Sequence, residues 1–407
     1  SGGNGLSLVP RWKQVPELDM DYHFRHLALP EPGGEREFGV VVSRLHSSAL
    51  DRSRPLWVFH LIEGLQGDRF AVYFKIHHAL VENINGLPLF MSMLSESSRE
   101  RNMAPVWALS DNEHVSGAVE PDADQFLSEL REKLPQAMDG AAAFGKAALG
   151  LARSALRRGN SDSDSFLIPA GAPRSTLNRR INAQRRFATQ HFALQRIEAV
   201  ASATGSTVNE VLTYLCSSSL RRFFKEYNAL PEESLVGLVP VSLQERDSHN
   251  PGNAIATLRI DLSTDIGNPL ARLNMIKQSM HAVRADRESL PESAASTYAL
   301  VRSAPLIVNQ LPVVGRLVPP LFNLKTSVTP GAEQPLYFNG ARLETIYPMS
   351  QLMQYSALSV DCVSYAGTLN IGFTGARDTL PHLQRLAVYM GHALEDLEEM
   401  AQEESAA

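Results

Sequence analysis

The sequence predicts a mixed α/β fold divided between two halves of similar construction. The chain has 407 residues, more than one ordinary hydrophobic core accommodates, and this length suits two domains. Segments that alternate like strands and segments with the period of amphipathic helices recur in both halves. Between the halves, residues 159–165 contain only Gly, Asn, Ser and Asp, which is typical of an exposed linker. We therefore expect an N-terminal domain over 1–158, a linker or crossover over 159–185 and a C-terminal domain over 186–407.

The composition is that of a globular protein, with 44% hydrophobic and 20% charged residues. A net charge of −6 argues against a general nucleic-acid binder. Cys216 and Cys362 are too few for a disulfide framework, so we expect two buried thiols, which suits a reducing cytoplasm. The sequence shows no uninterrupted apolar run of eighteen residues and no visible signal peptide, so we expect no membrane span.

Three well-patterned elements are predicted in the first half. Arg36–Leu50 has the period of a helix, and Trp57–Leu65 and Arg69–Ile76 alternate like paired strands joined by a turn at 66–68. Asp19–His26 is interpreted as a short strand, which would bring His23 and His26 near a cleft. Surface or structural histidines are the more frequent outcome for such residues.

Residues 100–124 lack any period and are predicted to be a loop, followed by a long helical stretch over Gln125–Arg158 that is interrupted near Pro135 and Gly140. Its second half is rich in Ala and carries Lys and Arg side chains. Two interpretations stay open for it, an interfacial helix attracted to anionic lipid and an ordinary helix packed on a domain.

The second half repeats the alternation of strands and helices. The predicted elements are strand Phe187–Leu194, helix Gln195–Thr204, a helix capped by Ser206 or Thr207 and running to about Tyr227, strands Leu235–Val241 and Ala254–Leu262, helix Pro269–Arg287, hairpin Leu358–Val363 with Thr368–Thr374, and helix Leu380–Glu399. Residues 296–324 are the most apolar region and are broken by four prolines. Core helices and a lipid-facing or tunnel-lining segment are both compatible with that pattern.

The stretch from Phe70 to Phe90 contains the residues with the clearest chemistry, His77 and His78. If the preceding strand continues, alternation places His78 on the face of its apolar residues and His77 on the other. A histidine is more often a hydrogen-bonded structural residue than a catalyst. A catalytic histidine needs a neutral imidazole held in one tautomer and aimed at a substrate hydroxyl, and Glu82 one turn later could orient it. No third ligand stands at a familiar metal spacing, so no metal site is predicted.

The run His77-His78-Ala-Leu-Val-Glu82-Asn83 resembles the HHxxxDG motif of the bacterial wax ester synthase / acyl-CoA:diacylglycerol acyltransferase family. Further blocks follow in the order of that family over about Trp12 to Leu397. They are Pro55-Leu56-Trp57, Ile62-Glu63-Gly64, Val208-Asn209-Glu210-Val211, Val239-Pro240-Val241-Ser242, Gly252-Asn253, Leu336-Tyr337, Asn339 to Glu344, Tyr347-Pro348, Asp378 and Pro381. The order of the blocks is what makes the resemblance specific.

The sequence departs from the family pattern at several of these blocks. Glu82 stands where the family has Asp, Asn83 where it has Gly, and Glu210 where its ND block has Asp. Ser327-Val328-Thr329-Pro330-Gly331 stands where the family usually reads SNVPG. The family's N-terminal region is expected to be missing, because residue 1 is Ser and the start is loop-rich.

The resemblance implies a chloramphenicol-acetyltransferase-like fold, two similar α/β domains with the active site in the channel between them. It implies an O-acyltransferase that moves a fatty acyl group from acyl-CoA to a long-chain alcohol or diacylglycerol, without a metal or other cofactor. His78 is then the general base, His77 and Glu82 support it, and Asn253 is the candidate donor to the tetrahedral oxyanion.

Substrate contacts are expected from Trp57, Asn83 and Asn209 of the same blocks. Arg179 and Arg180 belong to a basic cluster over 174–187 that would meet the phosphates of coenzyme A, although a solvated basic face is the more frequent explanation. The expected location is cytoplasmic and peripheral to a membrane or lipid inclusion.

Two alternatives stay open from the sequence. One is another acyl transfer on the same fold, as in the condensation domains of peptide synthetases. The other is a catalytically weakened or silent lipid-binding relative, favoured by Glu82, Asn83 and Val328. The sequence contains no Gly-x-Ser-x-Gly elbow of a serine hydrolase.

Overall fold

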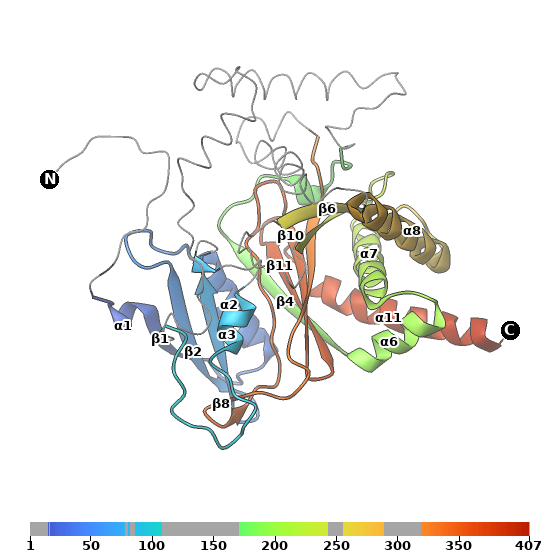
Figure 1. Cartoon of the computed structure of the whole chain (residues 1–407). Coiled ribbons are helices and arrows are strands. Elements are labelled where there is room, and N and C mark those ends of the chain that lie inside the picture. The colour runs from blue at the N-terminus through green and yellow to red at the C-terminus, as the bar shows by residue number, and fades with distance from the viewer. Residues whose placement is uncertain are drawn as a thin grey trace.

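The computed structural model describes residues 15, 17–77, 80–81, 86–107, 171–242, 255–288 and 319–406. These residues form a three-stranded sheet, a six-stranded sheet and a two-stranded ribbon (Figure 1). The predictions of a helix over Gln125–Arg158, of a linker at 159–165 and of broken apolar helices over 296–318 concern residues outside the described ranges.

The three-stranded sheet belongs to the first half and has the order β1-β2-β3. Its strands are β1 (Phe24–Ala28), β2 (Trp57–Leu65) and β3 (Arg69–Ile76), with β1 parallel and β3 antiparallel to β2. The bounds predicted for β2 and β3 are confirmed. Gly67 and Asp68 take positive φ angles of 78° and 53° in the turn that joins them, as a tight hairpin requires.

The prediction of a strand over Asp19–His26 is wrong in its first part. Residues Met20–His23 form a single helical turn, α1, and the strand starts only at Phe24. The side chain of Asp19 accepts a hydrogen bond from the backbone N–H of Tyr22 at 3.2 Å. This local bond favours a helical turn over an extended chain.

A helix covers each face of the three-stranded sheet. Helix α2 (Glu35–Ser47), which the sequence predicts over Arg36–Leu50, packs on the face of Ile62 and Tyr73. Helix α3 (Leu87–Met91) and residues 93–107 pack on the opposite face, against Phe59 and Phe74. Because side chains alternate along a strand, Tyr73 and Lys75 of β3 face α2, whereas Arg69 at the start of the strand is exposed.

The six-stranded sheet belongs to the second half and has the order β4-β11-β10-β7-β5-β6. Its strands are β4 (Arg185–Ala193), β5 (Val236–Ser242), β6 (Ile255–Asp261), β7 (Leu324–Pro330), β10 (Leu358–Tyr365) and β11 (Thr368–Ala376). Its helices are α6 (Leu194–Ala203), α7 (Val208–Glu226), α8 (Pro269–Glu288) and α11 (Gln384–Ala406), and the small elements are η2 (Thr176–Asn178), β8 (Tyr337–Phe338) and β9 (Ala341–Arg342). The predicted strands and helices of this half are present within a few residues of their expected bounds, except that α11 starts four residues later and ends seven residues later than predicted, and the sequence did not predict β7.

Helices α6, α7 and α11 lie on one side of the six-stranded sheet, and the three-stranded sheet lies on the other (Figure 1). The main hydrophobic core fills the helical side and contains Cys216 and Cys362 as buried free thiols, as predicted. Helix α7 begins with the expected cap, in which Thr207 and Glu210 form a capping box.

The described part of the predicted crossover, residues 171–184, is bonded to the second half. The N–H of Ala172 donates to the carbonyl of Pro320, and Asn323 Nδ2 donates to the carbonyl of Pro173. Asn178 Nδ2 donates to the carbonyl of Phe322 at 2.9 Å. These residues therefore stabilise the start of β7.

Polar side chains line the face of the six-stranded sheet that is turned toward the first half. They include Lys325, Ser327, Ser359, Asp361 and Thr374, of which the last three are buried. Residues 343–353, called the crossing chain below, cover this face, and α2 packs beside them on β4. A single hydrophobic cluster formed by Val42, Ile62, Phe187, Tyr347 and other residues thus joins both halves.

Among the described residues, no helix combines the length and hydropathy needed to span a membrane.

Gly372 is needed where the crossing chain touches the sheet. A Cβ atom on Gly372 would lie 1.9 Å from the carbonyl oxygen of Pro348, which is far inside van der Waals contact. Gly372→Ala should therefore force the two layers apart and destabilise the fold by on the order of 1–3 kcal/mol. Thermal unfolding measures this as a lower Tm.

Gly391→Ala, in the interior of α11, is the matched control. A Cβ atom there would meet only the flexible end of Gln190, at 3.3 Å, and alanine is a better helix former than glycine. This variant should keep or raise the Tm. Equal Tm values for the two variants would contradict the assigned contact.

Candidate active site

His77 stands directly after β3, in the connection between that strand and α3. Its backbone N–H donates to the carbonyl of Leu56 at 2.9 Å, and its own carbonyl accepts from the N–H of Leu80 at 2.9 Å. Trp57 is paired with Ile76 in the β2–β3 ladder. The Pro55-Leu56-Trp57 block therefore lies beside the His77–His78 stretch and fixes the strand end from which that stretch begins.

The chain returns to this strand end at Gly86, the residue before α3. A Cβ atom on Gly86 would lie 3.2 Å from Cγ2 of Ile76, so the backbone approaches the strand closely there. The two described ends of this stretch, His77 and Gly86, therefore both lie beside Ile76.

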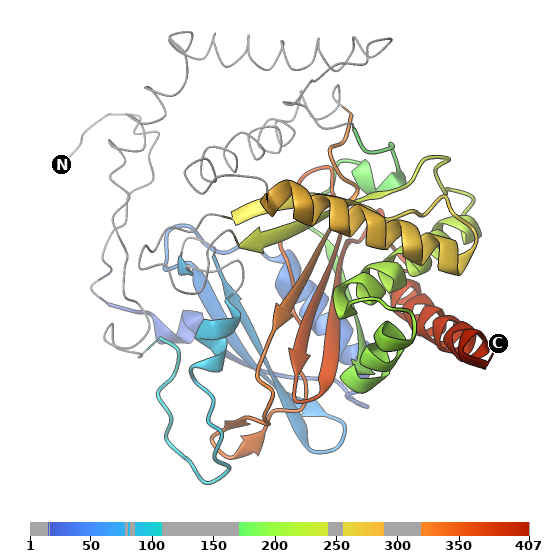
Figure 2. The same cartoon turned by 45° about the vertical axis from the view of Figure 1, so that its right-hand side comes forward.

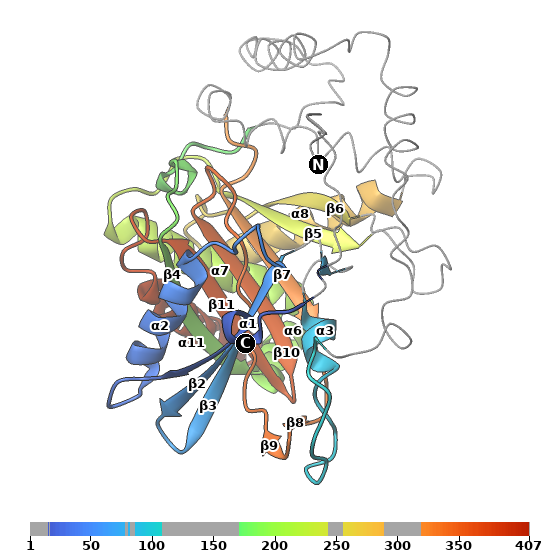
Figure 3. The same cartoon turned by 90° about the vertical axis from the view of Figure 1, so that its left-hand side faces the viewer.

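His78, Glu82, Asn83 and Asn253 lie outside the described residues. Asn253 stands two positions before β6, in the connection between paired residues Ser242 and Ile255. Figures 2 and 3 both place the arrowhead of β5 on the side of the molecule that carries α3. The roles of His78 and Asn253 stay predictions.

Trp57 is held in an aromatic cluster. The ring of His23 stacks on Trp57 with ring centroids 4.5 Å apart. The ring of Trp107 also stacks on Trp57, with centroids 5.3 Å apart. His23 is 1% exposed, and its Nδ1 is 2.7 Å from the carbonyl oxygen of Trp57. His23 is therefore a structural histidine, while His26 is exposed and pairs with Glu63 at 2.8 Å.

In the block at the start of α7, the two polar residues, Asn209 and Glu210, differ in exposure. Asn209 is exposed, whereas Glu210 is 1% exposed and accepts from the N–H of Thr207 at 2.8 Å through Oε2. Nε2 of His281 lies 3.6 Å from Oε1 of Glu210. Glu210 thus fixes the start of the helix, and substrate contact by Asn209 stays a prediction.

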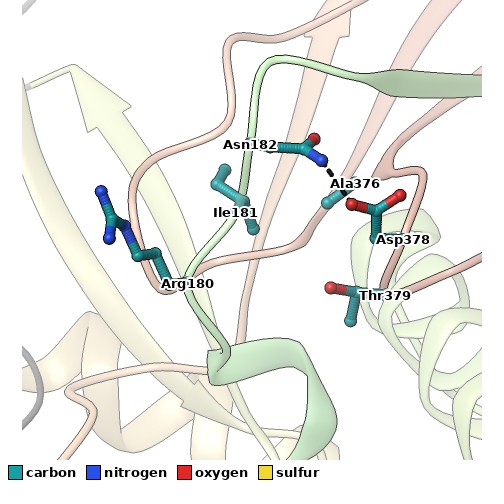
Figure 4. Close-up of a pocket in the computed structure, with 6 residues that line it drawn as sticks. All are labelled: Arg180, Ile181, Asn182, Ala376, Asp378 and Thr379. Carbon is teal, nitrogen blue, oxygen red and sulfur yellow. Dashed lines mark hydrogen bonds between the residues drawn. The ribbon is translucent and has the colours of Figure 1, made fainter.

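Arg179 and Arg180 are exposed on the segment before β4. Arg180 lines a surface cavity of about 250 Å³ together with Ile181, Asn182, Ala376, Asp378 and Thr379 (Figure 4). Asn182 donates its amide to the carboxylate of Asp378 inside this cavity. The carboxylate is thereby tied to the protein, and the guanidinium of Arg180 points away from it in Figure 4.

A group of half-buried polar residues that the sequence did not single out lies where β3 meets α2. Lys75 Nζ donates to the carbonyls of Leu45 at 2.6 Å, His46 at 3.3 Å and Ser48 at 2.7 Å. A cation at the carbonyl end of a helix is favourable, and burial lowers the pKa of Lys75 to about 8. The alternation of β3 contained the signal, but alternation alone does not say which face is buried.

His46 bridges the two halves at the same place. Its Nε2 is 3.2 Å from the carbonyl oxygen of Ser350, and its Nδ1 is 2.9 Å from the hydroxyl of Tyr73. Burial lowers the pKa of His46 to about 4, and the positive charges of Lys75 and Arg185 act in the same direction, against a carbonyl bond that raises it. The imidazole is therefore neutral at physiological pH.

Among the described residues, no group of three or more His, Cys, Asp and Glu side chains is arranged to hold a metal ion.

The buried His46 predicts a loss of stability in acid. The unfolded histidine binds a proton near pH 6.5 and the folded one only near pH 4, so the unfolded state holds more protons between these values. Stability should fall as the pH falls through this window, by roughly 3 kcal/mol for His46. His60, whose pKa burial also lowers to about 4, adds a second contribution.

His46→Gln tests this, because a carboxamide can keep both hydrogen bonds without titrating. Urea unfolding at pH 7 and pH 4.5 should show a smaller loss in the variant than in the native protein. His26→Gln, at an exposed position on β1, should leave the acid loss unchanged. The same loss in all three proteins would show that His46 does not cause it.

The comparisons with known proteins agree over nearly the whole chain. Residues 6–212 match the wax ester synthase/diacylglycerol acyltransferase catalytic domain, and residues 251–398 match the WS/DGAT C-terminal domain. A Mycobacterium tuberculosis protein named as a diacylglycerol O-acyltransferase is 37% identical, over 95% of this chain and 82% of its own. The O-acyltransferase WSD of Acinetobacter baylyi is 32% identical, over 93% and 81%.

Solved structures give the same fold. The wax ester synthase/diacylglycerol acyltransferase of Marinobacter aquaeolei superposes with a TM-score of 0.76 at 33% identity, over 96% of this chain and 83% of that one. The first condensation domain of the CDA synthetase, at 17% identity and a TM-score of 0.51, shares the fold alone. The predicted fold, two chloramphenicol-acetyltransferase-like domains, is confirmed. With its sequence blocks, its sheet arrangement and these relatives in agreement, the chain belongs to the wax ester synthase/diacylglycerol acyltransferase family.

Proposed function

We propose that this protein transfers a fatty acyl group from acyl-CoA to a long-chain alcohol or to diacylglycerol, forming wax esters or triacylglycerols. The observation that carries the proposal is agreement with this family over more than nine-tenths of the chain at 32–37% identity. The geometry supports it, because Leu56 and Trp57 of one family block hold the strand end that leads into His77 and His78.

In the proposed reaction His78 is the general base. It takes the proton of the acceptor hydroxyl as that oxygen attacks the thioester carbonyl, which contributes about 10²–10⁴-fold to the rate. The resulting tetrahedral oxyanion is stabilised by a hydrogen bond from the side-chain amide of Asn253. The carbon–sulfur bond then breaks, and the thiolate of coenzyme A leaves with the proton that His78 carries. No cofactor is needed, because acyl-CoA is itself a substrate.

His77, Glu82 and Asn83 are proposed to support the base. His77 anchors the turn through its backbone, and the Glu82 carboxylate holds the turn through a charged partner. Glu82 is one methylene longer than the Asp of the family motif, and Asn83 lacks the backbone freedom of Gly. We therefore propose that this variant motif is active but slower than the family pattern.

Substrate contacts are proposed at both halves. Arg179 and Arg180 would receive the phosphates of coenzyme A, and their segment lies close to the His77 strand through α2, since Ser47 Oγ accepts from the N–H of Arg185 at 2.8 Å. Trp57 and Asn209 are the proposed contacts to the acyl chain and acceptor. Association of the protein with a membrane or lipid inclusion, through 141–158 and 296–324, is proposed from the sequence alone.

The first test uses labelled acyl-CoA with and without hexadecanol. The native protein should form ester, His78→Ala should reduce it by at least about 10²-fold, and His77→Ala should keep much more activity. Circular dichroism and Tm values establish that both variants fold. Equal residual rates would contradict the assignment of the base, and tight binding of acyl-CoA without ester would identify a silent relative.

The variant motif is tested by the double substitution Glu82→Asp with Asn83→Gly. The shorter side chain moves the carboxylate by about 1.5 Å, and misplacement on that scale can cost about 10²-fold in rate. Ester formation per minute should rise in the double variant at equal thermal stability. A slower double variant would show that the site has adapted to Glu82.

A further inference from the structure

A chain of hydrogen-bonded polar groups, of which Tyr73 is buried and the others are half-buried, crosses the junction between the halves and takes no part in the proposed proton transfer. Lys325 on β7 donates from Nζ to Ser350 Oγ at 3.1 Å, and the carbonyl of Ser350 contacts His46 at 3.2 Å. His46 in turn contacts the hydroxyl of Tyr73 at 2.9 Å. Tyr73 lies on β3 four residues before His77, so the chain links the second sheet to the strand that leads into the active site.

Chemistry fixes the direction of each hydrogen bond in this chain. A backbone carbonyl can only accept, so Nε2 of His46 carries the hydrogen and Nδ1 is the acceptor. The hydroxyl of Tyr73 must then be the donor to Nδ1. Burial raises the pKa of Tyr73 far above its usual value, which keeps this hydroxyl protonated.

Lys75 provides a second connection between β3 and α2, in addition to the contact between Tyr73 and His46. It is the next residue on the same face of the strand, two positions before His77, and its ammonium group holds three carbonyls at the end of α2. Helix α2 is also bonded to the second half, since Ser43 Oγ and Ser47 Oγ accept from the N–H groups of Phe187 and Arg185 on β4. The end of α2 therefore stands between β3 and the six-stranded sheet and is bonded to both.

A half-buried chain of hydrogen bonds of this kind favours one arrangement of the groups it joins. Well-packed apolar side chains are often as stable as a buried polar network, but they permit small sliding movements. Each hydrogen bond here has a donor, an acceptor and a narrow range of lengths. By contrast, Arg69 and Glu344, which also join the halves at 3.3 Å, are 43% and 57% exposed and contribute little to the geometry.

We propose that Tyr73 and Lys75 are positioning residues. Through their bonds to α2 they fix the position of β3 relative to the six-stranded sheet, and so place His78 opposite the residues of the second half. The proposal rests on the proposed function, in which His78 from the first half and Asn253 from the second act on one thioester carbonyl. Misplacement by about 1 Å can cost about 10²-fold in rate. A register held by hydrogen bonds would prevent it.

The test compares four variants with the native enzyme in steady-state kinetics, well below each Tm. Tyr73→Phe removes only the hydroxyl, and Lys75→Met removes only the ammonium group. Each should lower kcat about tenfold while the KM values for acyl-CoA and alcohol stay within twofold. Lys75→Arg, which can still donate to the three carbonyls, should recover most of kcat. Tyr389→Phe is the matched control, because its hydroxyl bonds Glu226 on the surface of the helical layer, and it should keep native kcat.

Native kcat in Tyr73→Phe and Lys75→Met, with only a lower Tm, would overturn the proposal and leave these residues a purely structural role. If the native protein itself forms no ester, the proposed function has failed, and a second readout judges the positioning. This readout is the rate at which diethyl pyrocarbonate modifies the histidines, mapped by mass spectrometry. Tyr73→Phe should change the rate severalfold at 77–78 and leave the exposed His26 unchanged, and an unchanged rate at 77–78 would overturn the proposal.

Discussion

The face of the six-stranded sheet that is turned toward the first half is polar, and hydrogen bonds compensate the burial of Ser359, Asp361 and Thr374. The amide of Asn370, by contrast, is buried there with no partner among the described residues. Asp361 is 2% exposed and receives hydrogen bonds from Ser327 and Ser359, with Lys325 at 3.9 Å. An unpaired carboxylate there would be strongly destabilising. The crossing chain at 343–353 and the end of α2 complete this pairing, so the two halves are held in one relative arrangement.

That arrangement explains why sequence blocks far apart in the chain share one region. The block at 55–57 pairs with the strand end before His77, while the block at 336–344 reaches the first half through two backbone bonds between Ser95 and Tyr337. The N–H of Met103 donates to Asn339 at 3.2 Å as a further link. Residues of these blocks therefore act by holding the two halves together.

Much of the fold follows from local pattern. The alternation of β2 and β3, the period of α7 and α11 and the Thr207 cap are local features, and the structure agrees with them within a few residues. The strand predicted over Asp19–His26 was wrong because one side-chain bond from Asp19 stabilised a helical turn. Trp57 was expected at the site by resemblance, and the structure gives it a packing contact as well, while Glu210, noted as a departure from the family's Asp, caps α7.

The sequence by itself therefore determined the elements, the fold family and the stretch that carries His77 and His78, because these depend on spacing and order along the chain. Only the tertiary structure decided that Tyr73 and Lys75 face the end of α2 and that His46 meets Ser350, more than 300 positions away. The physical reason is that alternation assigns side chains to two faces but not to water or protein. That choice depends on which layer, contributed by a distant part of the chain, covers each face.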